Sequence, residues 1–344
     1  MQNSLSPGCE LCLRGAKLVL FVTGICDGSC YYCPLGEDRK GMDVIYADEV
    51  LVGRDLDIIL EAKAIDAEGT GITGGDPLLK LTRTLHYIKM LKGYFGQQHH
   101  IHLYTNGGHV SHEVLIKLKE AGLDELRFHP ALHDWNKIAL AKRIGIYAGA
   151  EVPAIPGEEK VLRDFVRYLD RVKADFLNIN QLEFCPPNAY QLKQRGFCLD
   201  GDTMASVNKS EDTAVALIDW ATNQGLEIPI HYCSSATKDR MQMRNRFIRR
   251  SRNVARPYES ITEEGLLSKL TLPVEGRVPK IFKASIAKKL NLKPHMLGLS
   301  TREGFIEAPE TVLSQLKKKA LASQISYVQE YPTINRERFV EYPC

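Results

Sequence analysis

Short apolar and β-branched runs alternate with helical stretches over the first 235 residues of the chain. In the stretches between the runs, apolar side chains recur every three or four positions, which is the period of an amphipathic helix. Strands that alternate with helices form parallel βα units, so seven such runs predict an α/β fold with a partial (β/α) barrel. The expected strands are residues 17–23, 69–73, 101–105, 125–129, 144–152, 176–182 and 227–232, and the expected helices are 48–64, 82–91, 112–121, 158–173 and 209–224.

The pattern changes after residue 254. Strands are expected at 265–272, 297–300, 305–307 and 325–330, with helices at 279–290 and 309–321. This β-α-β-β-α-β order is that of a ferredoxin-like sandwich, so a small α+β domain is expected at the C-terminus. We therefore expect an N-terminal extension at 1–16, a partial barrel at 17–235, a basic linker or helix at 236–256 and the small domain at 257–344.

The composition is that of an ordinary globular protein, with 44% apolar and 25% charged residues among 344. It excludes a disordered chain, a collagen and a small disulfide-stapled toxin. No apolar run approaches the roughly 18 residues needed to cross a bilayer, and the first eight residues lack the order of a signal peptide. We therefore expect a cytoplasmic protein without a membrane partner.

The chain has nine cysteines, and five of them lie within the first 33 residues. An odd number cannot pair completely into disulfides, and thiols of a cytoplasmic protein more often bind metal or react. Cys26, Cys30 and Cys33 directly follow the first expected strand, so they lie on a loop at the catalytic end of the barrel. Three thiolates at this spacing suit an iron–sulfur cluster with one open iron, or a zinc ion that lacks a fourth ligand.

The segment Cys26-x3-Cys30-x2-Cys33, with Tyr32 before the last cysteine, resembles the signature of the radical SAM superfamily. The resemblance implies a (β/α)6-type barrel in which the three cysteines hold a [4Fe–4S] cluster and S-adenosylmethionine (SAM) chelates the open iron. It further implies reductive cleavage of SAM to a 5′-deoxyadenosyl radical that abstracts a substrate hydrogen. Tyr32 would lie near the adenine, and an electron donor such as flavodoxin or ferredoxin would be a partner.

The resemblance covers roughly residues 17–235 and implies further contacts to SAM. Gly74, Gly75 and Asp76 end the second strand and resemble the Gly-Gly-Glu-Pro motif that holds the methionyl group of SAM, with Asp76 in place of the usual glutamate. Two glycines allow close approach of the backbone to a ligand. The ends of the next three strands supply further candidate contacts to the cofactor, namely Thr105, Asn106, Arg127, His129 and Val152.

The remaining cysteines form two groups and a terminal residue, Cys344, to which we assign no role. Cys9 and Cys12 precede the first strand, so we expect them at the opposite end of the barrel, as half of a structural zinc site, as ligands of an additional Fe–S cluster or as incidental thiols. Cys185, Cys198 and Cys233 lie after the sixth strand, in the next loop and after the seventh strand, so we expect them near the active mouth. They could bind a second cluster, donate hydrogen to a substrate radical or fill apolar space.

A basic stretch joins the two expected domains. Between residues 238 and 256 there are eight Lys and Arg residues and one acidic residue, which gives +8 − 1 = +7 in a chain whose net charge is +3. Such density suits phosphate contacts with RNA or with an anionic small substrate, and it also suits a solvated helix that links two domains.

We therefore expect a radical SAM enzyme whose substrate the sequence does not identify. Segments 21–26 and 32–35 resemble the archaeal group related to pyruvate formate-lyase activating enzyme, so a glycyl-radical activase-like protein is one alternative. The basic stretch makes modification of RNA, tRNA included, or of nucleotides a second. A non-catalytic metal-binding or RNA-binding scaffold is a third.

Overall fold

The computed structural model describes residues 5–201, 205–300, 302, 304–322 and 324–344. The chain divides into two compact units, the first formed by residues 1–63 and 67–242 and the second by residues 64–66 and 243–344. Within the described residues, no helix is both long enough and apolar enough to cross a membrane.

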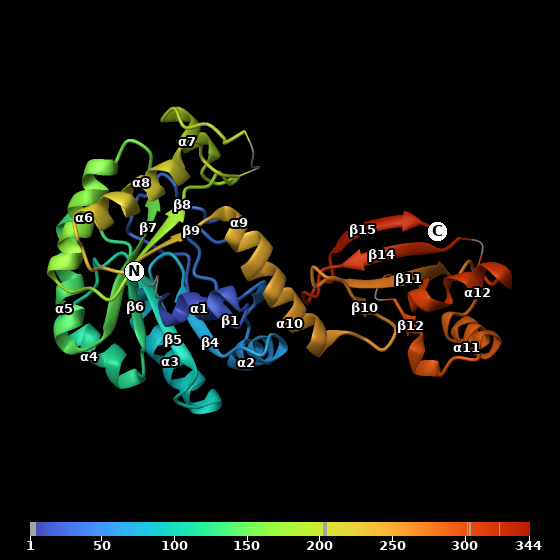
Figure 1. Ribbon diagram of the computed structural model, residues 1–344. Helices are drawn as coiled ribbons and strands as arrows, with labels where there is room; N and C mark the ends of the chain where they lie inside the picture. The colour runs from blue at the N-terminus through green and yellow to red at the C-terminus, as the bar shows by residue number, and fades with distance from the viewer. Residues whose placement is uncertain (1–4, 202–204, 301, 303, 323) are drawn as a thin grey trace. The chain divides into compact units, whose positions relative to one another are not determined.

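The first unit contains seven parallel strands that pair side by side in chain order (Figure 1). They are β1 (Lys17–Phe21), β4 (Gly69–Thr73), β5 (His100–Thr105), β6 (Glu125–Phe128), β7 (Tyr147–Ala154), β8 (Leu177–Gln181) and β9 (Ile230–Cys233). The hairpin of β2 (Tyr46–Ala47) and β3 (Val50–Leu51) adds to the free edge of β1 in antiparallel order. The expected partial barrel is confirmed, with one parallel strand more than the six of the expected type.

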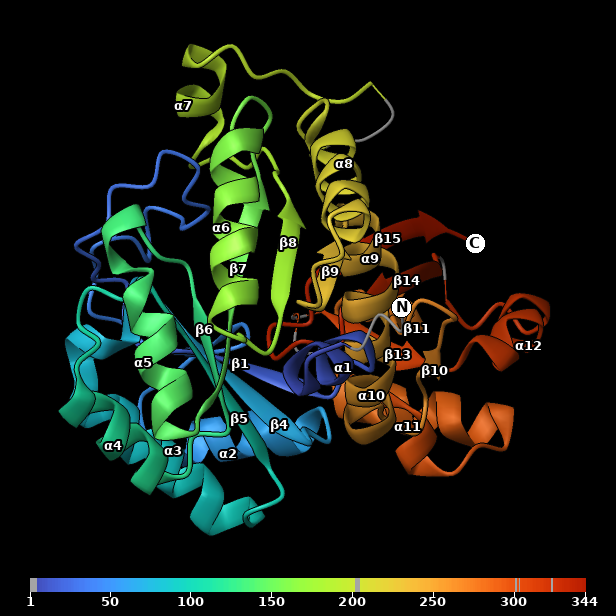
Figure 2. The ribbon, with the colours of Figure 1, turned by 60° about the vertical axis from the view of Figure 1, so that its left-hand side comes forward.

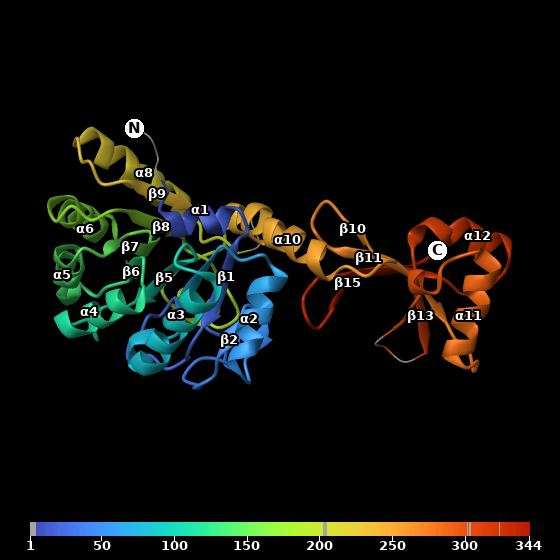
Figure 3. The ribbon, with the colours of Figure 1, turned by 90° about the horizontal axis from the view of Figure 1, so that it is seen from below.

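Helices cover the outer face of this sheet (Figure 3). They are α2 (Asp55–Ala64), α3 (Leu81–Phe95), α4 (His112–Ala121), α5 (Asn136–Ile144), α6 (Glu159–Arg171) and α8 (Ser210–Asn223), with α7 (Ala189–Gln194) in the loop after β8. The outward side chains Leu18, Ile72 and Leu103 are fully buried beneath them. The helix expected over 48–64 begins later than predicted, because residues 48–54 hold β3. The strand expected over 144–152 also begins later, because α5 occupies its first residue.

A helix that the sequence reading did not predict, α1 (Pro7–Leu13), lies on the inner side of the sheet (Figure 2). Ser6 caps it by accepting a hydrogen bond from the Cys9 amide, and Pro7 takes the first helical position, where a missing N–H costs nothing. The Gly8 amide donates to Glu125 Oε2 at 3.0 Å on β6. A Cβ on Gly8 would lie 2.5 Å from the Arg127 guanidinium, so glycine permits this approach.

Over its described residues, the second unit contains a six-stranded antiparallel sheet, helices packed on that sheet, and a further helix in the basic stretch that precedes the sheet. Its strands follow the order β12 (Gly298–Leu299), β13 (Phe305–Ala308), β11 (Leu267–Pro273), β14 (Ser326–Glu330) and β15 (Arg338–Pro343), and β10 (Ser260–Ile261) pairs with β11. The helices α11 (Pro279–Leu290) and α12 (Leu313–Lys318) share one apolar core with the sheet. Without β10 and β15, which were not predicted, the strand order is that of the expected ferredoxin-like sandwich.

The basic stretch forms a π-helical turn at Lys238–Met243 and then α10 (Arg244–Val254). Several of its cations bind the protein itself. Arg249 donates to the backbone carbonyls of Ile65 and Asp66, Arg250 to that of Pro332, and Arg256 pairs with Glu307. These bonds favour the interpretation of the stretch as a structural helix over that of a free phosphate-binding surface.

Candidate functional site

The loop after β1 carries Cys26, Cys30 and Cys33, all with free thiols. Backbone bonds between Gly24, Gly41 and Met42 close its base, and the Asp43 carboxylate accepts hydrogen bonds from Thr23 and Arg83 at 2.9 and 2.6 Å. Cys26 and Cys30 are exposed and Cys33 is half-buried, so the loop presents thiols on a fixed base.

Gly74 and Gly75 lie directly against the start of this loop. The amides of Gly75 and Asp76 donate to the carbonyls of Thr23 and Ile25 at 2.7 and 2.9 Å. A Cβ on Gly74 or Gly75 would come within 2.4 Å of those same carbonyl oxygens, a distance that real side chains do not reach. The glycines therefore let the end of β4 pair with the beginning of the cysteine loop. This pairing is a structural reason for the Gly74-Gly75 motif, which we expected to hold the methionyl group of SAM.

The Asp76 carboxylate is fully buried, and both of its oxygens accept hydrogen bonds from the protein. One oxygen accepts from the Leu78 amide at 2.8 Å, and the other accepts from the Thr105 hydroxyl and the Asn106 amide at 2.9 and 3.0 Å. Burial raises the pKa of Asp76, although these hydrogen bonds oppose the change. Asp76 and Thr105, both expected to touch the cofactor with their side chains, instead bind each other and tie the end of β4 to the end of β5.

Asn106 lies next to the cysteine loop, as its expected role requires. Its amide nitrogen donates to Asp27 at 2.8 Å and lies 4.0 Å from Cys26 Sγ. His109 contacts the same Asp27 carboxylate at 2.8 Å. These hydrogen bonds from Asn106 and His109 lower the pKa of Asp27, so the carboxylate is ionised beside the loop.

Tyr32 and His129 form the polar contact that links the cysteine loop to β6. The Tyr32 hydroxyl and His129 Nε2 are 2.7 Å apart, and His129 Nδ1 lies 2.9 Å from the carbonyl oxygen of Glu151. Burial raises the pKa of Tyr32, and a hydrogen bond with His129 lowers the pKa of the Cys30 thiol. A thiol with a lowered pKa is better prepared to bind a metal as thiolate.

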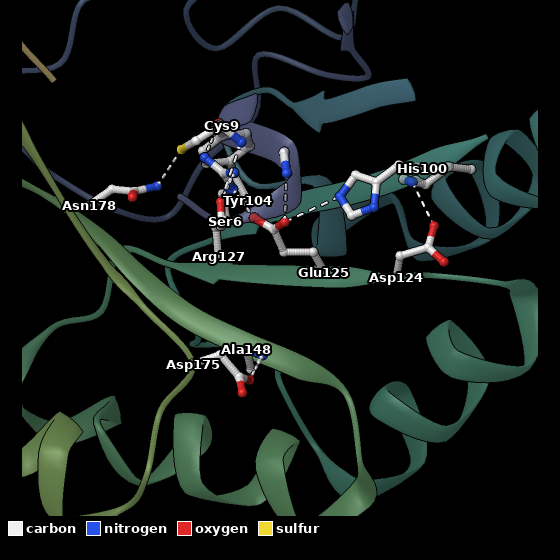
Figure 4. A network of polar contacts seen from close by, with 12 residues as sticks. Ser6, Cys9, His100, Tyr104, Asp124, Glu125, Arg127, Ala148, Asp175 and Asn178 are labelled. Atoms are coloured by element: carbon white, nitrogen blue, oxygen red, sulfur yellow. Dashed lines mark hydrogen bonds and ion pairs between the residues drawn. The ribbon is translucent and has the colours of Figure 1, made fainter. Parts of the chain in front are cut away.

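Arg127 is the centre of a polar network on the inner side of the sheet. Its guanidinium is buried, contacts Glu125 at 2.6 Å and donates to the Ser6 hydroxyl at 2.8 Å (Figure 4). It also contacts Glu151 at 2.7 Å. It therefore anchors α1 inside the barrel, and the cofactor contact expected for it stays a prediction. Val152 is half-buried on β7 and pairs in register with Ile179 of β8.

The remaining thiols are grouped differently from the prediction. Cys185 follows β8, and its amide donates to Asn188, whose side chain also donates to the Tyr32 carbonyl at 3.1 Å. Cys198 lines a separate surface hollow beside Phe197 and Arg195. The expected separation of Cys9 and Cys12 from Cys233 was wrong, because all three line one cavity inside the first unit.

This inner cavity has a volume of about 250 Å³. Sequence reasoning overlooked most of its polar lining, although inward and outward residues alternate along the strands; on β5, for example, His102 and Tyr104 alternate with Leu103. The capped start of α1, Ser6-Pro7, was the signal that could have placed the N-terminal cysteines here. The lining residues are Cys9, Cys12, Lys17, Tyr104, Arg127, Glu151, Asn178, Asn180, His231, Cys233, Lys238 and Gln242.

The donor set on the loop after β1 fits an iron–sulfur cluster. Three thiols share one short segment, one of them has a lowered pKa, and the segment reaches solvent, where SAM could approach the fourth position. Within the described part of the chain, no three Cys, His, Asp or Glu side chains already stand as a ligand set for a metal ion.

Comparisons with known proteins place this site in context. Residues 20–172 match the family model described as the Radical SAM superfamily. A Methanocaldococcus jannaschii protein, named as a candidate glycyl-radical enzyme activating enzyme, is 45% identical over 277 residues, which cover 77% of this chain and 72% of that protein.

Solved structures are similar at low identity. Streptococcus suis SuiB bound to precursor peptide SuiA is 11% identical over 65% of this chain, with a TM-score of 0.48, and the chain spans about half of the length of SuiB, 51%. A second, anSMEcpe with bound AdoMet and a peptide, is 14% identical over 62% of each chain, with a TM-score of 0.43.

Proposed function

The chain belongs to the radical SAM superfamily, and on this premise we propose that Cys26, Cys30 and Cys33 hold its [4Fe–4S] cluster and that the adjoining loops hold SAM. When bound, the cluster supplies the electron that cleaves SAM to the 5′-deoxyadenosyl radical, which abstracts hydrogen from the substrate. The backbone around Gly75 and the side chains of Tyr32 and Asn106 frame the position of SAM. A reduced flavodoxin or ferredoxin is the proposed source of the electron.

We propose further that the substrate is a polypeptide and that hydrogen is taken from the Cα of a glycine residue. The observation that carries this proposal is the 45% identity, over most of both chains, to a protein named as a candidate activating enzyme of glycyl-radical enzymes. At this identity over most of both chains the two proteins share their fold, so a shared reaction class is the simplest interpretation.

The experiment uses deuterium to trace the hydrogen that the radical removes. The anaerobically reconstituted enzyme is incubated with SAM, dithionite and the protein fraction of M. jannaschii cells grown on α-deuterated glycine. We expect 5′-deoxyadenosine that carries deuterium, and a glycyl-radical signal in electron paramagnetic resonance. The variant Cys26→Ala/Cys30→Ala/Cys33→Ala should give neither. Unlabelled 5′-deoxyadenosine alone would contradict the glycine substrate while leaving the SAM cleavage intact.

A second candidate function, modification of RNA, is favoured by lysines of the second unit. The ends of α11 and α12 lie together, because the Lys319 ammonium donates to the Lys289 carbonyl at 2.5 Å. Lys288, Lys289, Lys317 and Lys318 are exposed there, and among the described residues none of these four ammonium groups has an ion-pair partner within 4 Å. Such a cluster suits the phosphate backbone of a nucleic acid.

The same deuterium experiment separates the two candidates. Total RNA from cells grown in deuterated water replaces the protein fraction, and transfer of deuterium to 5′-deoxyadenosine would then favour RNA. The variant Lys288→Ala/Lys317→Ala should weaken RNA binding and reduce its dependence on salt. RNA binding that is insensitive to salt would contradict this second candidate.

A further inference from the structure

We propose that the inner cavity of the first unit is a second metal centre, in which Cys9, Cys12 and Cys233 supply three thiolates to a thiophilic metal, either a zinc ion or an iron–sulfur cluster. Cys233 is more than 200 positions from Cys9 and Cys12 in the sequence, but all three line the same cavity. The proposal goes beyond the cluster on the loop after β1 and does not depend on the identity of the substrate.

The fold brings the three thiols together through α1. Cys9 and Cys12 are three positions apart on this helix, so their side chains lie on one face, and the helix is inserted against the inner side of the sheet. Cys233 is the last residue of β9, and a π-helical turn, Lys238–Met243, follows shortly after it. Turns of this type occur frequently at functional sites, and both Lys238 and Gln242 of this turn line the cavity.

The lining is polar, which argues against cysteines that merely fill apolar space. Asn178 donates to Cys9 Sγ at 3.1 Å (Figure 4), and Gln242 donates to Cys233 Sγ at 3.4 Å. Hydrogen bonds to sulfur of this kind surround thiolates that bind metals and tune them. The imidazole of His231, two residues before Cys233, lines the same cavity and could supply a fourth ligand.

One of the residues that line the cavity, Asn178, has a buried polar atom without a partner in the part of the chain that the structure describes. Asn178 is 1% exposed, and among the described residues its carbonyl oxygen, Oδ1, has no hydrogen-bond partner. An unpaired buried acceptor is unfavourable, so such groups normally have a hydrogen-bond partner or a water molecule beside them. The volume of about 250 Å³ exceeds the roughly 30 Å³ of one water molecule several times and leaves room for a larger group.

The charged side chains around the cavity balance one another. Arg127 is paired with Glu125 and Glu151, and Lys238 is paired with Glu183. Lys17 also lines the cavity, and within the described part of the chain it has no carboxylate within ion-pair distance. Together the three cations and the three carboxylates sum to +3 − 3 = 0, so the Lys17 ammonium offsets the second carboxylate of the Arg127 pair.

The thiols of the cavity do not yet stand as a ligand set, and the same is true of Cys26, Cys30 and Cys33. Because the radical SAM cysteines also stand apart, the separation of the cavity thiols is no argument against the second site. We infer that the thiols converge at both sites as the metal binds.

The decisive experiment counts metal in a protein that cannot bind the first cluster. In Cys26→Ala/Cys30→Ala/Cys33→Ala, purified anaerobically from iron- and zinc-supplemented cultures, we expect about one zinc per chain or several irons with matching sulfide. Adding Cys9→Ser, Cys12→Ser and Cys233→Ser should remove at least 90% of it. Adding Cys198→Ser and Cys344→Ser instead should leave it unchanged, because neither residue lines the cavity. The ratio of iron to zinc identifies the metal.

A chain that holds neither zinc nor iron in the first variant overturns the proposal, whatever the result of the SAM-cleavage experiment. A second measurement avoids any question of folding. In the wild-type holoprotein, iodoacetamide labelling followed by mass spectrometry should find Cys9, Cys12 and Cys233 protected and then reactive after metal chelation. The exposed Cys198 should react both before and after. Equal reactivity of Cys9, Cys12 and Cys233 before and after chelation would also contradict the site.

Discussion

The Tyr32 hydroxyl and the His129 imidazole are joined by a contact of 2.7 Å across 97 positions of sequence. The other ring nitrogen of His129 lies 2.9 Å from the Glu151 carbonyl oxygen, so the histidine spans from the backbone of β7 to the residue before Cys33. The Asn188 side chain donates to the Tyr32 carbonyl from the far side. The cysteine loop is thus fixed to the barrel at its middle as well as at its base.

We expect His129→Ala to impair the cluster site more than Tyr32→Phe. The alanine removes partners of Tyr32, Cys30 and the β7 backbone together, whereas phenylalanine retains the ring that packs edge-on against Tyr31. Iron content and the rate of 5′-deoxyadenosine formation should fall at least tenfold in His129→Ala and less than fivefold in Tyr32→Phe. Equal losses in the two variants would show that the hydroxyl alone carries the effect.

We expect Asp76→Ala to destabilise the first unit by about 3 kcal/mol, because it leaves the Leu78 amide, the Asn106 amide and the Thr105 hydroxyl without their acceptor. Asp76→Glu introduces the residue usual in this motif, yet its extra methylene has no space in a fully buried position and should cost about 1–3 kcal/mol. Urea midpoints measure both. A variant Asp76→Glu as stable as the wild type would contradict the tight fit.

Arg127→Met should be among the most damaging single changes in the barrel. It leaves the buried carboxylate of Glu125 and the half-buried carboxylate of Glu151 without their cation, and removing one partner of a buried ion pair costs about 3–5 kcal/mol. Addition of Glu125→Gln and Glu151→Gln should restore part of the stability, since no buried charge then remains unpaired. Thermal melting followed by circular dichroism gives the comparison, and no recovery in the triple variant would show that Arg127 acts mainly by packing.

The strands of the barrel were predictable because their apolar outer residues, such as Leu18 and Ile72, follow the β pattern directly. The ferredoxin-like order was predictable for the same reason. The inner side was not predictable, because polar residues there are turned away from solvent. Arg127, which is buried, and Glu151, which is half-buried, look like functional or exposed groups until their pairing is known. Such pairing depends on which strands are neighbours, and local sequence patterns do not contain that information.

The cysteine loop was predicted from the spacing of its three cysteines alone. The hydrogen-bond partners of the residues beside the loop were not predicted. We expected Asp76 and Thr105 to contact the cofactor. In the structure the Thr105 hydroxyl donates a hydrogen bond to the Asp76 carboxylate, 29 positions away in the sequence. The place of Cys9 and Cys12 required knowing that α1 turns into the barrel, which follows from the bonds of Ser6 and Gly8 to β6 residues rather than from any pattern around the cysteines.

The stability of the first unit should decrease in mild acid because of His99. This histidine is 3% exposed, and its ring nitrogen lies 2.8 Å from the Thr70 hydroxyl. Burial, with the nearby positive charges of Lys92 and His100, lowers the pKa of His99 from 6.5 to about 4, although Asp124 opposes the change. Between these two pH values the unfolded chain binds a proton that the folded chain refuses, so folding loses stability as the pH falls.

The loss should begin near pH 6.5, reach roughly 3 kcal/mol and level off below about pH 4, where both states are protonated. Urea unfolding at half-unit steps of pH measures it. In His99→Gln this part of the slope should vanish, because glutamine stays neutral and can still bond to Thr70. The exposed His133 serves as the control, since His133→Gln removes a histidine that is 82% exposed and should leave the slope as in the wild type. A slope that survives in His99→Gln would assign the acid sensitivity to another buried group.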